Sequence, residues 1–160
     1  MRAIRFLFPV ALAALSMLQP AAAQNKAALA KSNAEFYKQA SGLSASLADL
    51  SKRISTASPN DRDMLKLVVN QLSVINASAE GVLDLGVLTT EVRDASDMAI
   101  VKKHLTARCV SFRSSTEATA KYIESVSSNI AAVATAAEVN KARELLMQMG
   151  QNAVCGPVGK

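Results

Sequence analysis

The chain of 160 residues is 50% hydrophobic but only 4% aromatic, contains no Trp, and has a formal net charge of +5. Its length suits one domain, and its apolar content comes mainly from Ala, Leu and Val, which favours closely packed helices. The mildly basic balance does not suggest a dedicated nucleic-acid binder.

The N-terminal 23 residues have the three parts of a secretory signal peptide. Arg2 and Arg5 precede an uncharged apolar run over residues 6–18. That run is too short to cross a bilayer as a helix, which takes roughly 20 residues, and this argues against the alternative of a retained N-terminal anchor. Pro20 then breaks the run, and the alanines at 21–23 are small enough for a signal peptidase. We therefore expect residues 1–23 to be removed.

The mature chain, residues 24–160, is expected to be a single exported domain, located in a bacterial periplasm or otherwise outside the cell. Loss of Arg2 and Arg5 leaves 16 basic and 13 acidic residues, a net charge of +3. We expect no second uncharged apolar run of membrane-spanning length, and hence no membrane span after cleavage.

The first half of the mature chain predicts two long helices. The first covers residues 26–57, and its apolar residues recur at steps of three and four, as in helices that pack in coiled-coil fashion. Pro59 ends this helix and begins the next, with Ser58 as its cap. The second helix has the same spacing from Leu65 to Val82, and Gly81 and Gly86 predict its end and a turn over residues 86–90.

The third helix is predicted to be the longest, over residues 91–134. Apolar residues from Met98 to Ala137 share one heptad register, interrupted by the polar residues Lys102, Thr116 and Thr119. Ser114 and Glu117 match a capping box that would start a new helix, but the unbroken register favours one continuous helix.

A short fourth helix is predicted from Thr135, where Thr135 and Glu138 form a second capping-box match, to Gly150. Residues 151–160 are expected to form an irregular tail. The predicted fold is therefore an all-α antiparallel helical bundle of three long helices and one short C-terminal helix.

The two cysteines, Cys109 and Cys155, are expected to form a disulfide, because an exported protein passes through an oxidising compartment. From Cys109 to Val133 the third helix climbs about 36 Å at 1.5 Å per residue. The fourth helix and an extended tail return at most about 39 Å, so the tail can reach Cys109. Their wide separation in sequence favours a structural bond over a redox-active pair, which is typically a CxxC motif.

No motif for catalysis, metal binding or a cofactor stands out, so we expect neither an enzyme nor a metalloprotein. His104 is the only histidine, and it lies beside the apolar stripe of its helix, which suits a solvated surface residue. Met147 and Met149 are soft ligands that suit Cu(I), but residues two apart on a helix point in different directions.

The most asymmetric feature is a basic stretch without acids between Met98 and Thr116. Its charged residues are candidates for contact with an anionic envelope component or an acidic protein: Lys102, Lys103, Arg108 and Arg113, beside His104. On a helix these charges point in several directions, and the alternative is a solvated segment balanced by acids on neighbouring helices.

The sequence thus predicts an exported, non-enzymatic protein that interacts with another protein or with the envelope. The alternative is a bundle that binds a small molecule or a metal between its helices, with Lys102, Thr116 and Thr119 as the polar groups inside the register. An exposed apolar stripe would favour the first function, and an enclosed pocket at those three residues would favour the second.

Overall fold

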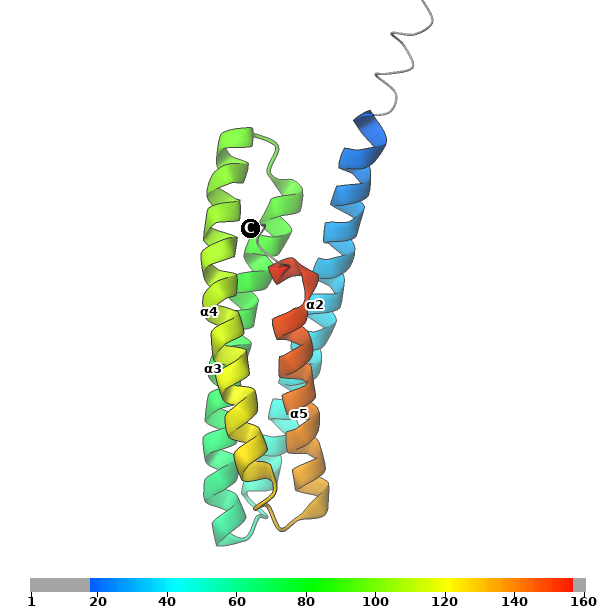
Figure 1. Ribbon diagram of the computed structural model, residues 1–160. Helices are drawn as coiled ribbons and strands as arrows, with labels where there is room; N and C mark the ends of the chain where they lie inside the picture. The colour runs from blue at the N-terminus through cyan, green and yellow to red at the C-terminus, as the bar shows by residue number, and fades with distance from the viewer. Residues whose placement is uncertain (1–17, 157–160) are drawn as a thin grey trace, which may run out of the picture.

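The computed structural model describes residues 18–156, and side chains from residue 25 onward. Within this range the chain forms four α-helices and one 3-10 turn, and no strand: α2 (Leu18–Ile54), α3 (Pro59–Glu91), α4 (Ala95–Ser127), α5 (Val133–Gln151) and η1 (Ala153–Cys155). The helices run alternately up and down in an antiparallel bundle, which confirms the predicted fold class (Figure 1). The predicted cleavage position, between Ala23 and Gln24, falls inside α2, and residues 1–17 and 157–160 lie outside the described part.

The apolar stripes of α2 and α3 form much of the core, as their spacing predicts. Phe36, Leu43 and Leu50 of α2 are completely buried, and so is Leu72 of α3. The rings of Phe36 and Phe112 lie with their centroids 5.6 Å apart, which joins α2 to α4 across the core. Burying each of these large apolar side chains stabilises the fold by about 1.5–3 kcal/mol.

The caps of α3 and α4 follow from local sequence. The Ser58 hydroxyl accepts a hydrogen bond from the Asp61 N–H at 3.2 Å, and Pro59 occupies the first turn of α3, as predicted. Asp94 caps α4 by accepting from the Ser96 N–H at 2.8 Å and the Asp97 N–H at 3.2 Å. The Ser96 hydroxyl and then these N–H groups lower the pKa of Asp94, because they stabilise its charged form.

The predicted turn at residues 86–90 is wrong, because α3 continues to Glu91. Gly86 is buried at a point where α2 and α3 approach closely, and a Cβ atom there would lie 2.6 Å from Oδ1 of Asn33. The Asn33 amide donates to the Gly86 carbonyl oxygen at 2.9 Å. This glycine therefore permits helix contact and does not mark a turn.

The predicted continuity of α4 through Ser114 is confirmed, but the helix ends at Ser127 and not at residue 134. The turn that follows breaks the heptad register, so Val133 is 83% exposed and Ala137 is also exposed. Both were expected in the core stripe.

The predicted capping box at Thr135 is wrong as well. The helix α5 begins at Val133, and its N-cap residue, Ala132, makes no side-chain hydrogen bond. Asp61 of α3 replaces that cap: its buried carboxylate accepts from the N–H groups of Ala131 and Ala132 at 3.1 and 3.4 Å. A residue 70 positions away thus fixes the start of α5.

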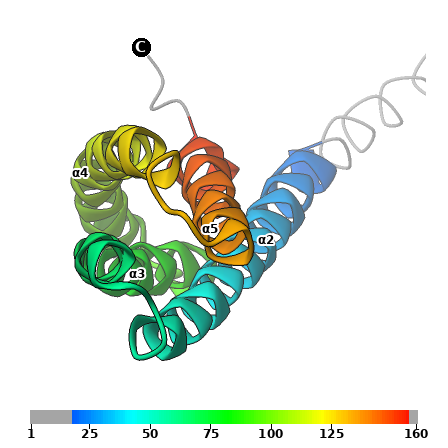
Figure 2. The same ribbon diagram turned by 90° about the horizontal axis from the view of Figure 1, so that it is seen from below.

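The four helices surround a common core (Figure 2), and they do so only over the length of α5 (Figure 1). Beyond η1 the paired ends of α3 and α4 continue, while the N-terminal part of α2 leans away from them (Figures 1 and 2). Around the bundle, α3 contacts α2 and α4, and α5 also contacts α2 and α4, so α3 and α5 lie diagonally opposite.

Candidate functional site

The outward face of α3 carries a stripe of exposed apolar side chains. Leu67 is 55% exposed, Val74 is 62% exposed and Leu88 is 44% exposed, and Gly81 completes the series at seven-residue spacing. Seven residues make nearly two helical turns, so these four positions share one side of the helix. We call these four residues the α3 stripe. It was missed in the sequence, although the same seven-residue spacing that identified the core could have revealed it.

By length and composition alone, α3 is also the one helix in the described part that could cross a membrane. The core helix of a soluble protein passes the same test, and α3 buries a full stripe of its own against the bundle. The apolar character of α3 therefore has two sources, a core side and the outward α3 stripe.

Charged residues of opposite sign border the α3 stripe on its two edges. On the edge toward α2 lies Glu80, one turn after Asn76, which accepts a hydrogen bond from Ser44 of α2 at 2.9 Å. Asp84 follows Glu80 on the outward surface, and both are exposed. On the other edge is Arg108 of α4, whose Nε and Nη2 would lie 3.4 Å from a Cβ atom at Gly81.

These bordering charges form no ion pair within the part of the chain that the structure describes. The five ion pairs among the described residues are Lys31–Glu35, Arg53–Asp49, Lys66–Asp63, Lys141–Glu138 and Arg143–Glu124. None includes Glu80, Asp84 or Arg108. The edge at Arg108 is also hollowed, by a shallow depression of about 400 Å³ that Leu85 and His104 help to line.

The predicted basic segment does not form one surface. Lys102 lies on the core side of α4, seven residues before the buried Cys109, but it is exposed, because η1 meets α4 at Cys109, about 10 Å further along the helix. Lys103 points to solvent elsewhere on α4. Arg108 lies against α3, and Arg113 faces α5.

Arg113 lines a hollow of about 220 Å³ between α4 and α5, and its Nε atom is buried without a hydrogen-bond partner. Thr116, Glu117, Met147, Gly150 and Gln151 complete the lining. Gly150 lets the helices approach here, since a Cβ atom on it would lie 2.8 Å from Oγ1 of Thr116. The structure thus places Thr116 at a hollow, whereas Thr119 is buried and Lys102 lies elsewhere.

The predicted pairing of Cys109 with Cys155 is present in the structure. Their Cα atoms are 5.3 Å apart, within the usual range for a disulfide, and both residues are buried. The bond ties η1 to the middle of α4, with α5 antiparallel to the second half of α4 (Figure 1).

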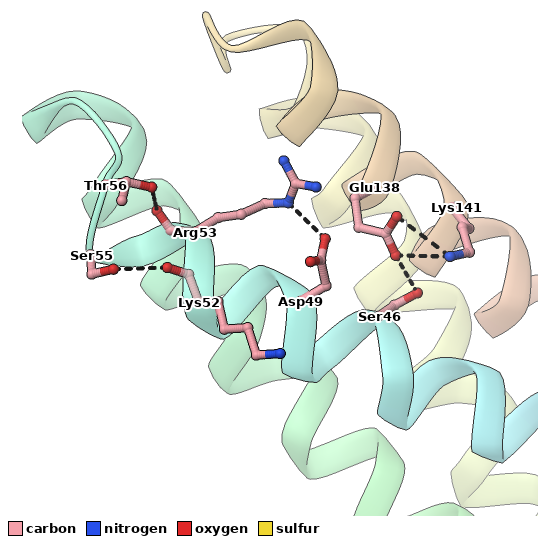
Figure 3. A network of polar contacts seen from close by, with 8 residues as sticks. All are labelled: Ser46, Asp49, Lys52, Arg53, Ser55, Thr56, Glu138 and Lys141. Carbon is pink, nitrogen blue, oxygen red and sulfur yellow. Dashed lines mark hydrogen bonds and ion pairs between the residues drawn. The ribbon is translucent and has the colours of Figure 1, made fainter.

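A polar network joins α2 to α5 at the opposite end of the bundle (Figure 3). The buried Ser46 hydroxyl donates to Oε1 of Glu138 at 2.7 Å, and Lys141 pairs with the same carboxylate at 3.0 Å. On α2, Nε of Arg53 donates to Oδ2 of Asp49 at 2.7 Å. These groups satisfy one another within the fold, and the bond from Ser46 to Glu138 fastens α2 to α5.

Among the described residues, no group of three or more His, Cys, Asp or Glu side chains could hold a metal ion. No family model, no curated protein and no solved structure matches the chain. Within the described part of the chain, two surface features are candidates for binding, namely the α3 stripe with its bordering charges and the hollow at Arg113.

Proposed function

We propose that this chain is an exported, non-enzymatic helical protein that binds another polypeptide chain through the α3 stripe. The observation that carries the proposal is the seven-residue repeat of exposed apolar side chains on one side of α3. From Leu67 to Leu88 the stripe extends about 31 Å at 1.5 Å per residue. An elongated apolar surface of this kind, bordered by charge, is typical of a protein–protein contact, and heptad spacing suits a partner helix lying alongside.

Export is supported by the N-terminal sequence and by the disulfide. Residues 1–23 have the composition of a signal peptide, and a pair of bonded cysteines suits the periplasm or the extracellular space. Intact mass of the protein recovered from the envelope fraction tests this. A mass that begins at Gln24 supports export, and retention of residues 1–23 contradicts it.

The contact function is tested by recovering partners from an envelope extract with the full chain as bait. The double variant Leu67→Glu with Val74→Glu places charge on the α3 stripe. The matched control, Val110→Glu with Val133→Glu, places the same charge on exposed apolar residues elsewhere. A polypeptide that wild type and control both recover, and that the stripe variant loses, supports the function. Equal recovery by all three baits overturns it, provided that circular dichroism shows all three folded.

The hollow at Arg113 favours a second function, the binding of a small anionic molecule between α4 and α5. A buried guanidinium nitrogen without an acceptor costs free energy that a bound carboxylate would recover. Thermal unfolding with a panel of small carboxylates, on wild type and on Arg113→Met, tests it. A carboxylate that stabilises wild type and not Arg113→Met supports binding. If no carboxylate in the panel stabilises wild type, the hollow does not bind small carboxylates.

A further inference from the structure

We infer that the chain bound at the α3 stripe is a second copy of this protein, related to the first by a twofold axis parallel to α3. This inference rests on the proposed function of the α3 stripe as a contact surface and names the partner. Two features carry it: the spacing of the exposed apolar residues and the arrangement of the bordering charges.

The spacing favours two parallel copies in register. Because the exposed apolar residues recur every seven positions, a parallel copy places Leu67 against Leu67, Val74 against Val74 and Leu88 against Leu88. A parallel partner helix meets the same position of α3 once in every heptad, which is one of the two positions of a coiled-coil seam. Gly81 lies under the Arg108 side chain of its own chain, so the apolar contacts come from Leu67, Val74 and Leu88.

The charges select the parallel arrangement over the antiparallel one. A twofold axis parallel to α3 brings the Arg108 edge of one copy against the opposite edge of the other, at the same height along the helix. Arg108 lies over Gly81, and the acids Glu80 and Asp84 lie within one turn of Gly81. Each Arg108 therefore faces Glu80 and Asp84 of the other copy. An antiparallel pair would instead bring like edges together, with Arg108 near Arg108 and acid near acid.

The opposite charges on the two edges of the α3 stripe also explain why the partner is a second copy. A twofold contact uses the same patch on both chains, so the patch must be complementary to itself. The α3 stripe meets this condition, because it is apolar and is bordered by one cation, Arg108, on one edge and by the acids Glu80 and Asp84 on the other. Arg108, Glu80 and Asp84 form no ion pair with another residue of the described range 18–156, and in the dimer Arg108 of each copy pairs with the two acids of the other.

Light scattering coupled to size exclusion tests the dimer on the full chain recovered from the envelope. Wild type is expected to dimerise, and Arg108→Glu to raise the dissociation constant by about tenfold or more, since it sets like charges against each other. The control Lys121→Glu makes the same charge change on an exposed part of α4 away from the stripe. Adding Glu80→Arg and Asp84→Arg to Arg108→Glu exchanges the two edges and should restore dimerisation. Dimers that Arg108→Glu does not weaken, or that the exchange does not restore, overturn the arrangement.

A cysteine at position 67 tests the direction of the two helices. In the parallel dimer the two copies of Leu67→Cys lie opposite each other and should form an intermolecular disulfide under mild oxidation. In an antiparallel dimer they are far apart, and no such bond forms. Val110→Cys, at a position that is 63% exposed against 55% for Leu67 and lies away from the α3 stripe, serves as the control for random collision. Equal cross-linking at both positions contradicts the parallel contact.

The outcomes separate this inference from the function on which it rests. A monomeric wild type that still recovers another polypeptide through the α3 stripe would refute the second copy and leave the contact function standing. A monomeric wild type with no stripe-dependent recovery would refute both.

Discussion

Removing the disulfide should destabilise the protein, and the loss should begin at its C-terminal end. The bond joins residues separated by 46 positions. In the chain-entropy model, closing a loop of that length stabilises the fold by roughly 4 kcal/mol, and measured values are often smaller. The double variant Cys109→Ala with Cys155→Ala should therefore lower the free energy of unfolding by about 2–4 kcal/mol.

The structure also predicts where the variant loosens first. The helix α5 keeps its own anchors without the bond, because Leu146 and Met149 are completely buried. The turn η1 has fewer anchors without the bond, chiefly the buried Val154 and the hydrogen bond from Asn152 to Gln39 at 3.0 Å. We therefore expect η1 to detach before α5, and α5 before the three long helices.

Urea unfolding followed by circular dichroism gives the change in stability, and limited proteolysis gives its location. Reductant should shift the wild-type midpoint toward that of the double variant and leave the variant itself unchanged. New cleavage sites should lie after Glu138. An unchanged midpoint in the double variant, or cleavage spread evenly over the chain, would refute the reasoning that the bond holds the C-terminal end.

Three further changes test the core, a helix contact and a cap. Leu72→Ala, at a completely buried position, should lower the free energy of unfolding by about 2–5 kcal/mol, measured by urea unfolding. Gly86→Ala should destabilise by about 1–3 kcal/mol, because the new Cβ meets Oδ1 of Asn33 at 2.6 Å; a neutral result would mean that α2 yields there. Asp94→Asn should be less stable than wild type at neutral pH but equal to it in acid. Because the pKa of Asp94 is lowered in the folded state, its charged cap contributes its full stability above the ordinary pKa of 3.8. This contribution is lost as the pH falls through the folded-state pKa. A difference in stability between Asp94→Asn and wild type that does not change with pH would contradict this account.

The parts of the fold that could be predicted are those governed by local periodicity. The core stripes of α2 and α3 follow from steps of three and four, since residues at this spacing lie on one face of a helix. The Ser58–Pro59 boundary was predictable for the same reason, because proline and the cap act on their own neighbours. The disulfide needed only helix rise and chain reach.

The errors occur where distant residues decide the local structure. Gly86 resembles a turn residue until α2 is placed against it. Thr135 matches a capping box, but Asp61 already occupies the start of α5. Lys102 lies in the core register yet is exposed, because η1 meets α4 further along the helix, at Cys109. Each depends on a neighbour that local spacing does not reveal.

The candidate site was missed for a different reason. The search for core positions stopped at one stripe for each helix, whereas α3 has two, a buried one and the outward series at Leu67 and Val74. The basic segment drew attention because its charges are close in sequence, but the fold sends Arg108 and Arg113 to opposite sides of α4. Of these two arginines, only Arg108 borders the α3 stripe.

The position of α3 in the bundle makes it a suitable contact helix. It lies diagonally opposite α5, so its outward face points away from the disulfide and from the hollow at Arg113. A chain bound along the α3 stripe would therefore leave the hollow at Arg113 accessible, while the buried disulfide takes no part in the contact. In the proposed function α3 provides the contact surface, and the α4–α5 side closes the fold and presents the hollow.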